Sequence, residues 1–513
     1  MYNYYVVNYG SSTIDIPRNS FILSKDSWDD WGFVTMFHMY YIDSNCEKIT
    51  LGETKIGFKG QKPRNSIDID YSDQTHKKLP RIFPNLEGLD KVFFSLGQSP
   101  EFYDKFYKIF GDETHLHLSN LNDLSVNPLN LYKYTNEDSF KTSLIRTVDI
   151  WQINNQFSRI IRGRGKLTDY DFRYNYIGNL IDFNVKAESS PPTNIHALIG
   201  KNGVGKTTIL NNMFDDLLLL NESGNFTDNT ARYDEDEGYP IEPDYFSKVI
   251  YISYSIFGRY TPIITDEKKF SYIGLKNKSK DSKYFIKDTN ELAKEFFVNL
   301  ANIKSSKSMK IIFEDILLYF SNSYEDSIIQ SLMSDAKEPF DFESFESLSS
   351  GHAIVLLVIV NLIANVIEKT LVLFDEPETH LHPPLLSALI RAINDVLVKK
   401  NGVCIFATHS PVVLQEIPKS CVITMHRIGE SVRLERPKTE TFGENVSTLT
   451  HDVFSLEVRS TGFYNLLNKK FEENYTIGDI KQEFNRQLGS EALSLLYLLE
   501  HNKHAKLNGY PIK

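Results

Sequence analysis

Hydrophobic residues in the first third of the chain follow two patterns. The runs 4–9, 32–42 and 49–58 are rich in aromatic and β-branched residues, which predicts strands. The second and third runs are separated by the polar turn Asp43-Ser44-Asn45, so we expect them to pair. Between 139 and 161, apolar residues recur mostly every three or four positions, which predicts a helix. Residues 1–165 are therefore expected to fold as a mixed α/β region.

Farther along, continuous apolar runs alternate with segments of helical spacing. The runs 195–199, 249–252, 370–374 and 403–407 have the composition of strands buried on both faces. The apolar stretch 353–367 is shorter than the roughly 20 residues that cross a bilayer, so we interpret it as a buried helix. The alternation predicts an α/β fold with a mainly parallel sheet covered by helices.

These patterns divide the chain into three parts. The N-terminal region is followed by an α/β domain at 166–445, with an insertion at about 215–340, and by a helical C-terminal segment at 446–513. In that segment, the leucines of 490–500 predict an amphipathic helix. We expect this helix to pack within the chain, and docking of a partner is the alternative.

Composition adds a few constraints. The 513 residues suffice for two or three domains, and the three cysteines are too far apart in sequence for a zinc finger or a disulfide framework. The N-terminal residues lack the pattern of a signal peptide, so we expect a cytoplasmic protein with no membrane segment. A net charge of −11 argues against attraction of nucleic acid to the whole surface. The acidic stretch 215–244 and the basic stretch 266–287 are interpreted as solvated loops.

The strongest chemical signal follows the apolar run 195–199. Residues 200–207 match the GxxxxGK(S/T) pattern of a phosphate-binding loop between a strand and a helix. In such a loop, backbone N–H groups surround the phosphates, the lysine reaches the β and γ phosphates, and the last hydroxyl binds Mg²⁺. The residues predicted to hold ATP here are Gly200, Lys201, Asn202, Gly203, Val204, Gly205, Lys206, Thr207 and Thr208.

Two acidic residues, Asp375 and Glu376, follow the predicted strand 370–374. Ligands of an α/β sheet bind at this end of its strands. Asp375 is predicted to hold Mg²⁺ together with Thr207, and Glu376 to orient or deprotonate the attacking water. Taken alone, the pair is also compatible with an ordinary turn at a strand end.

Ser349, Ser350 and Gly351 precede the apolar helix that starts near residue 353. Ser349 is suited to cap that helix, and hydroxyl and amide groups at the positive end of a helix can hold a γ-phosphate. Farther on, the run 403–407 leads into Thr408 and His409, whose imidazole is predicted to lie beside the γ-phosphate. Taken singly, a helix cap and a structural histidine are the more common explanations.

In this order, the four elements resemble the head of ABC-type ATPases. The sequence LSSGH at 348–352 is similar to the signature motif, 378–383 to the D-loop, and His409 to the switch histidine. The resemblance implies an ATPase that binds ATP and Mg²⁺. It also implies a homodimer or a larger oligomer, because Ser349 and Gly351 of one chain would contact ATP held by Lys206 of another.

The chain departs from the ABC pattern after the run 249–252. ABC heads usually carry a glutamine there, whereas this chain offers Ser253 or Ser255. In the signature, Ser350 replaces the second glycine and His352 the usual glutamine. We therefore expect hydrolysis to be slow or regulated by a partner.

Three further segments, 93–98, 191–196 and 442–446, resemble the PtuA-like ATPase of Septu-type and retron-associated antiphage defence systems. That resemblance implies a separate HNH-type nuclease partner and, in retrons, a reverse transcriptase with its RNA–DNA hybrid. We assign no nuclease chemistry to this chain, because the DxD pair of OLD-type nucleases is absent after His409.

Two other hypotheses remain open. One is a DNA-repair clamp similar to the RecF-type group, in which Arg159, Arg162, Arg164, Lys166 and 268–287 would contact phosphates. The other is a nucleotide-sensing scaffold with negligible turnover.

Overall fold

The structure is a computed structural model, and it describes most of the chain. Contacts divide the chain into two compact units, Met1–His196 with Ile209–Phe406 and Ala197–Thr208 with Ala407–Lys513. We describe the folding of each unit by itself. The described residues are those of 2–507 without 12–15, 65–73, 85–87, 127–130, 164–166, 168, 188, 220–224, 230–238, 256–259, 261, 263, 265, 279–283, 322, 334–339, 430, 459–461 and 474.

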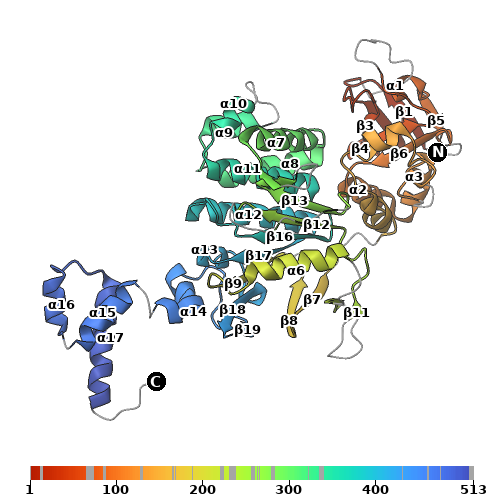
Figure 1. Ribbon diagram of the computed structural model, residues 1–513. Coiled ribbons are helices and arrows are strands. Elements are labelled where there is room, and N and C mark those ends of the chain that lie inside the picture. The colour runs from red at the N-terminus through yellow and green to blue at the C-terminus, as the bar shows by residue number, and fades with distance from the viewer. Residues whose placement is uncertain are drawn as a thin grey trace. The chain divides into compact units, whose positions relative to one another are not determined.

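The N-terminal region is built on a six-stranded sheet with the order β5-β1-β2-β3-β4-β6, drawn in red to orange in Figure 1. Strand β1 runs parallel to β2, and the other neighbours are antiparallel. The predicted pairing of the second and third runs is confirmed as β3 with β4. The elements are β1 (Asn3–Val7), β2 (Ser20–Lys25), β3 (Met36–Ile42), β4 (Lys48–Phe58), α1 (Thr75–Lys78), β5 (Ile82–Pro84), β6 (Phe93–Gly97), α2 (Pro100–Phe110), η1 (Gly111–Glu113) and α3 (Thr114–Asn120).

The prediction of one helix at 139–161 is wrong in its middle. The structure has π-helical turns η2 (Phe140–Leu144) and η3 (Gln152–Phe157), followed by α5 (Ser158–Ile161). At the interruption, the Ser143 carbonyl accepts the Arg146 N–H three residues on, which tightens the turn, and it also accepts a hydrogen bond from the buried Lys55 ammonium. The Asp149 carboxylate then accepts from the Trp151 N–H, which starts the next turn. Tertiary hydrogen bonds thus override the apolar periodicity.

A buried charge cluster lies beneath η2. The Lys55 ammonium and an Asp30 carboxylate oxygen are 2.7 Å apart, and both side chains are only 1% exposed. Arg146 reaches the other Asp30 oxygen at 2.8 Å. Burial alone would raise the pKa of Asp30, but the charge and hydrogen bond of Lys55 outweigh it and hold that pKa below its usual value. The carboxylate therefore stays ionised inside the core.

The predicted mainly parallel sheet is confirmed. Its seven strands have the order β13-β12-β16-β17-β9-β18-β19. Strand β12 is parallel to both β13 and β16, and β9 is parallel to β18. Because β12 and β13 belong to this sheet, the segment 215–340 is not a wholly separate insertion. The strands are β9 (Ile195–Gly200), β12 (Lys248–Ser253), β13 (Phe270–Gly274), β16 (Thr370–Asp375), β17 (Val403–Thr408), β18 (Val422–Ile428) and β19 (Ser431–Glu435).

Helices cover the part of this sheet that belongs to the first unit. In Figure 1, α7, α8 and α11 lie above its strands, and α6 lies below them. Helix α11 begins at Ser350 and is buried along most of its length, which confirms the predicted apolar helix. The helices are α6 (Lys206–Leu219), α7 (Thr289–Lys304), α8 (Lys307–Leu317), η4 (Leu318–Phe320), α9 (Asp326–Leu332), α10 (Phe342–Glu346), α11 (Ser350–Asn365) and α12 (Pro383–Lys400).

Two smaller sheets accompany this fold. One has the order β11-β10-β7-β8, and the other is the pair β14 and β15. Phe172 of β7 stacks on Phe183 of β8 at a ring separation of 5.0 Å, which joins that hairpin through its buried face. The strands are β7 (Tyr170–Tyr176), β8 (Asn179–Val185), β10 (Phe226–Asp228), β11 (Tyr239–Pro240), β14 (Lys276–Lys278) and β15 (Tyr284–Ile286).

The described residues between 446 and 507 are mainly helical, as predicted for this segment. Leu495 and Leu496 of the predicted amphipathic helix are buried against Leu467, Phe471 and Ile480. The helix therefore packs within the chain, as expected. The elements of this part are α13 (Pro411–Leu414), η5 (Lys419–Cys421), α14 (Val446–Val458), α15 (Gly462–Glu472), α16 (Ile477–Glu483) and α17 (Ser490–Leu507).

The buried ion pair makes a testable prediction about stability. The substitution Lys55→Met should lower the free energy of unfolding by about 3 kcal/mol, because it leaves the Asp30 charge in the core without its nearest cation. Urea denaturation followed by circular dichroism measures the loss. Lys62→Met is the matched control, since Lys62 and Asp138 form an exposed pair that contributes less than about 1 kcal/mol. Equal effects of the two substitutions would contradict this account.

Candidate nucleotide-binding site

The predicted phosphate loop connects β9 to α6. Gly203 and Gly205 have φ angles of 80° and 105°, a left-handed backbone that glycine adopts without strain. Lys206 is the first residue of α6, so the loop leads into the positive end of a helix of 14 residues. This backbone fits a triphosphate, because such a turn directs N–H groups toward an anion. The predicted strand-loop-helix context is confirmed.

The Lys206 side chain folds back onto its own loop. Its ammonium donates to the carbonyl oxygens of Gly200 at 2.8 Å and of Lys201 at 2.9 Å, and the residue is 5% exposed. These two bonds hold the positive charge beside the loop. The neighbouring Asn202 and Gly203 are exposed. The Lys206 ammonium is therefore held in place, while Asn202 and Gly203 of the loop face solvent.

Strand β18 supports the loop in a way that the motif does not reveal. A Cβ atom on Gly200 would lie 2.5 Å from the Met425 carbonyl oxygen, so no larger residue fits there. Arg427 of the same strand donates to the Gly203 carbonyl oxygen at 3.3 Å. Both residues lie more than 200 positions beyond the loop, and no sequence signal points to them. The parallel pairing of β18 with β9 brings them there.

The acidic pair lies at the end of β16. Asp375 is its last residue and is 4% exposed, whereas Glu376 is half-buried. In the ladder between β12 and β16, Ser253 lies directly opposite Asp375. Ser253 therefore occupies the strand end where ABC heads usually have a glutamine, as one of the two predicted substitutes. Ser255 lies beyond the end of the strand.

Glu376 has an unusual backbone. Its φ angle is 50°, in the left-handed region that costs a non-glycine residue roughly 1–2 kcal/mol. His380 is also left-handed, at 67°. Between them, the Thr379 N–H donates to the Glu376 carbonyl oxygen and the Leu381 N–H to that of Glu378, which makes two successive turns. Strain of this kind gathers at functional positions and persists because the surrounding structure holds it.

The predicted signature begins α11. Ser349 is the N-cap, and its hydroxyl accepts a hydrogen bond from the His352 N–H at 3.4 Å, as predicted. Ser349 and Ser350 are exposed, whereas Gly351 is buried. A Cβ atom on Gly351 would lie 2.7 Å from the His380 carbonyl oxygen. The signature is thus packed directly on the turn that follows the acidic pair.

His352 contributes to this cap. Its Nδ1 atom is 3.0 Å from the Ser349 hydroxyl, and its ring centroid is 4.5 Å from that of Tyr324. The Tyr324 hydroxyl donates to the His352 carbonyl oxygen at 2.7 Å. In the described part of the chain, the buried Nε2 atom of His352 has no hydrogen-bond partner. A glutamine would not provide the ring contact with Tyr324.

The remaining predicted residues divide between the two units. His409 follows β17 and is exposed, and Thr207 and Thr208 lie in the first turn of α6. These three belong to the same unit as the phosphate loop, whereas Ser349, Gly351 and the acidic pair belong to the other. The roles assigned to these residues in nucleotide binding and catalysis stay predictions.

The basic residues of the DNA-clamp hypothesis are largely engaged elsewhere. Arg159 donates to both oxygens of the buried Glu368 carboxylate, at 2.8 and 2.6 Å. Lys269 donates to the Pro243 carbonyl oxygen, and Lys287 pairs with Glu295 at 2.8 Å. Arg164 and Lys166 lie outside the described residues. Arg162 and Lys268 are exposed, so only part of the described basic set is engaged within the chain.

Comparison with known proteins places the chain in a family. It is 36% identical to protein ea59 of Escherichia phage lambda, over 98% of this chain and 99% of that protein. The chain belongs to the ea59 family. A family model described as "AAA domain, putative AbiEii toxin, Type IV TA system" matches residues 277–415. That range includes the signature, the acidic pair and His409, but not the phosphate loop.

Solved structures of ATP-binding heads are similar at a much lower level. A nucleotide-free ATP-binding cassette from an ABC transporter is 13% identical, covering 57% of this chain and 100% of that chain with a TM-score of 0.29. An SmcHead bound to the C-winged helix domain of ScpA is 11% identical, covering 52% and 96% with a TM-score of 0.27. With scores this low, the assignment of the fold depends on the strand order and the motifs described above.

Strand order, phosphate loop and family model together identify an ABC-type P-loop ATPase domain in this member of the ea59 family. The expected α/β fold class is thereby confirmed. Across the residues that the structure describes, no helix combines the length and the apolar character needed to cross a bilayer.

The left-handed backbone of Glu376 leads to a prediction about stability that does not depend on catalysis. Glu376→Gly should be more stable than Glu376→Ala by about 1 kcal/mol, because glycine adopts the left-handed conformation without strain. Thermal unfolding of the two purified variants gives the difference. Glu378 is the matched control, since it is not among the residues of positive φ, and there the glycine variant should be the less stable. If the glycine variant were the more stable one at both positions, the backbone strain assigned to Glu376 would be disproved.

Proposed function

We propose that this chain binds ATP with Mg²⁺ and hydrolyses it slowly as part of a dimer or a larger oligomer. The observation that carries the proposal is the exposure of Ser349 and Ser350 beside a buried Gly351 that packs on the turn after Glu376. A helix N-terminus with exposed hydroxyl groups suits a γ-phosphate that another copy of the chain supplies. Because Gly351 packs on the turn after Glu376, contact of Ser349 and Ser350 with the γ-phosphate would be linked to the position of the acidic pair.

Each residue then has a definite task. Lys206 and the loop amides would hold the β and γ phosphates, and the oxygens of Thr207 and Asp375 are the ligands that Mg²⁺ prefers. The half-buried Glu376 would orient the attacking water, and His409 would contact the γ-phosphate. Bound Mg²⁺ supplies charge neutralisation during phosphoryl transfer.

Slow turnover is the part of the proposal that depends on Ser253. The serine lies opposite Asp375 at the end of β12, and its short side chain reaches less far than a glutamine. Positioning of the attacking water supplies much of the catalysis of phosphoryl transfer, so a shorter group at this place lowers the rate. A partner protein could supply the missing group.

The substitution Glu376→Gln tests the catalytic assignment. It should reduce ATP turnover at least 100-fold while ATP still binds, because the amide cannot act as a base. Light scattering in the presence of ATP and Mg²⁺ should then show a dimer that persists. Lys206→Ala is the contrasting variant, since it should lose ATP binding itself. If wild type and Glu376→Gln turn over ATP equally, Glu376 is not the base.

For the biological role, we propose a subunit of an antiphage defence complex that regulates a separate HNH-type nuclease. Support comes from the PtuA-like segments and from the matching family model, whose description names a toxin of a type IV TA system. In a retron version, a reverse transcriptase and its RNA–DNA hybrid would join the complex. Since the relative ea59 is a phage protein, such a defence would act between competing phages in this family.

The DNA-clamp alternative has fewer available cations than the sequence suggests, because Arg159 is neutralised by Glu368 and Lys287 by Glu295. It makes a different prediction, namely tight binding of the isolated chain to DNA with a steep salt dependence.

A cleavage assay tests the nuclease assignment. The purified chain should leave plasmid and phage DNA intact with ATP and Mg²⁺, and should cleave only after an HNH-type nuclease encoded beside it is added. Gel electrophoresis of the DNA gives the result. Degradation by the isolated chain that survives both Lys206→Ala and Glu376→Gln would show that this chain is itself the nuclease, and the proposal would fail.

A further inference from the structure

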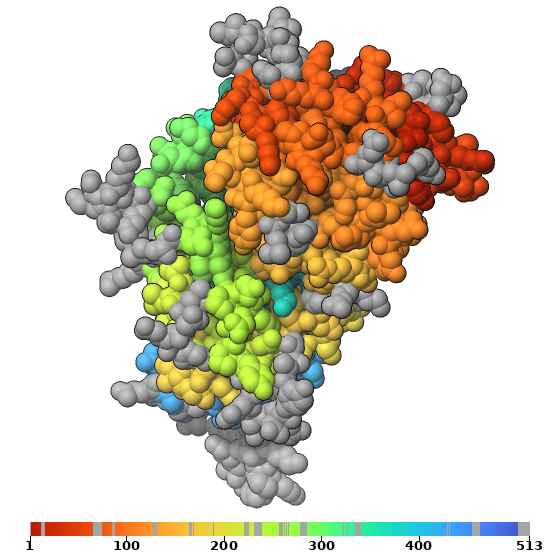
Figure 2. Space-filling view, turned by 90° about the vertical axis from the view of Figure 1, so that its right-hand side faces the viewer, coloured from red at the N-terminus to blue at the C-terminus, as the bar shows by residue number. Residues whose placement is uncertain are grey.

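A large polar pocket lies in the first unit, away from the phosphate loop. The cavity has a volume of about 720 Å³, within the range of small-molecule sites. Residues of the segments 98–108 and 145–167 form one side, and residues of 248, 299–312, 364–368 and 399–400 form the other. Figure 2 shows the face on which the orange N-terminal residues border the green residues near 300. We call this cavity the polar pocket.

Most charges around the polar pocket are already neutralised. Arg146 pairs with Asp30, Arg159 with Glu368, and Lys399 with Asp315 at 2.9 Å. Asp104 likewise pairs with Lys108 at 2.6 Å. These pairs are structural, and they leave little attraction for a ligand.

Two lysines are different. Lys248 donates to the Asn365 side-chain oxygen at 3.0 Å, and Lys400 donates to the Ile363 carbonyl oxygen. Neither has a carboxylate within ion-pair distance among the described residues. Burial lowers the pKa of both, that of Lys400 to about 8. Their acceptors, on Asn365 and Ile363, belong to the same last turn of α11, so both ammoniums are held beside that end of the helix. Since an ammonium has three N–H groups, each of the two half-buried lysines has two donors with no described protein acceptor.

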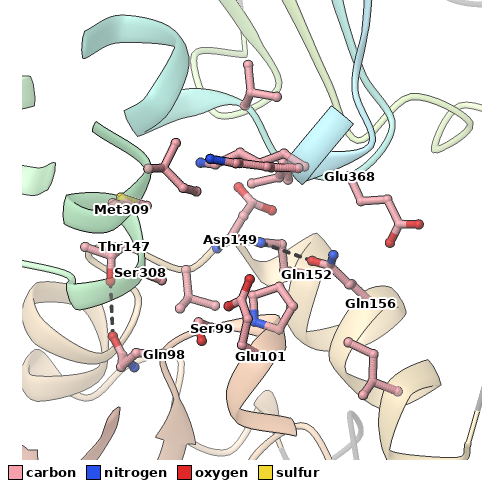
Figure 3. A pocket seen from close by; sticks show the side chains of 18 of the residues that line it. Gln98, Ser99, Glu101, Thr147, Asp149, Gln152, Gln156, Ser308, Met309 and Glu368 are labelled. Carbon is pink, nitrogen blue, oxygen red and sulfur yellow. Dashed lines mark hydrogen bonds between the residues drawn. The ribbon is translucent and has the colours of Figure 1, made fainter. Parts of the chain in front are cut away.

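Two carboxylates complement them. Glu101 lies in the first turn of α2, and it raises the pKa of Lys400 without reaching ion-pair distance. Asp149 acts in the same way on Lys248. Figure 3 shows Glu101 and Asp149 among the labelled side chains of the pocket, with Gln152 beside Asp149. One oxygen of Asp149 accepts from the Trp151 N–H, which leaves the other for a ligand.

We propose that the polar pocket binds a molecule of the size of a nucleoside monophosphate. Its phosphate would bind Lys248 and Lys400, and its hydroxyl or amino groups would donate to Glu101 and Asp149. A simple anion would contact only the two lysines, and a simple cation would contact only the two carboxylates. A ligand that combines an anionic group with hydrogen-bond donors satisfies both sets.

The position of the polar pocket suggests what such a ligand does. Residues 364–366 at its wall form the C-terminal end of α11, the helix that carries Ser350 and Gly351 at its other end. A ligand in the polar pocket would therefore bind at the C-terminal end of α11, whereas the predicted contact with ATP lies at its N-terminal end. Any effect on turnover rests on the proposed ATPase function, whereas binding itself does not.

Calorimetry tests the proposal in a chain whose phosphate loop has been disabled. In the Lys206→Ala background, titration with AMP, GMP, CMP and UMP should reveal saturable binding of at least one of them. Adding Lys248→Met or Lys400→Met should weaken that binding at least tenfold. Lys294→Met is the matched control, because Lys294 is exposed on α7 outside the pocket, and binding should be unchanged.

Two further titrations test the phosphate group and the donor groups of the ligand separately, one with inorganic phosphate and one with the Glu101→Gln variant. Inorganic phosphate should bind more weakly than the nucleotide, and Glu101→Gln should weaken only nucleotide binding. The proposal is overturned if no nucleotide binds at millimolar concentration to folded protein, or if the pocket substitutions change nothing. Equal affinity for inorganic phosphate and every nucleotide would also refute it. Loss of ATP turnover in Glu376→Gln tests the ATPase separately, so the two failures are distinguishable.

Discussion

The close approach of Gly351 to the carbonyl oxygen of His380 is the constraint on which the candidate site depends. A side chain at 351 would stand 2.7 Å from that oxygen, so α11 and the turn after β16 meet through backbone alone. The same turn starts with the left-handed Glu376 and ends with the left-handed His380. Two strained residues within five positions are stable only because the surrounding structure holds them. The helix contact therefore sets where the Glu376 carboxylate lies.

In the first unit, the ion pair of Arg159 with Glu368 and several hydrogen bonds join the N-terminal region to the α/β part. Arg146 binds Asp30 and also donates to the Asn302 side-chain oxygen of α7, at 3.4 Å. Glu53 of β4 accepts a hydrogen bond from the Lys307 N–H at the start of α8. Removing one partner of a buried ion pair is costly, so the contact of Arg159 with the buried Glu368 holds the two parts together. The polar pocket lies among them, where a ligand would meet both parts of the unit.

In the second unit, the segment after β19 is fastened to α13. The Gln415 amide donates to the Glu444 carbonyl oxygen at 2.6 Å, and the Gly443 N–H donates back to the Gln415 carbonyl oxygen. The Thr441 hydroxyl donates to the Ile417 carbonyl oxygen. One of the three PtuA-like segments, 442–446, is thus packed on the helix that follows His409. Only the short helix α13 separates these contacts from His409 in the sequence.

The sequence by itself determined the elements whose signals are local. The glycines of the phosphate loop, the cap by Ser349 and the apolar strand before Asp375 each depend on neighbours a few positions away, so the pattern predicts them. Tertiary structure decided the rest. The helix predicted at 139–161 is interrupted where the Ser143 carbonyl bonds both the Arg146 N–H and the distant Lys55 ammonium, and Met425 and Arg427 reach the loop only through parallel strand pairing. The left-handed Glu376 is likewise invisible in sequence, because long-range packing, not local preference, holds its backbone.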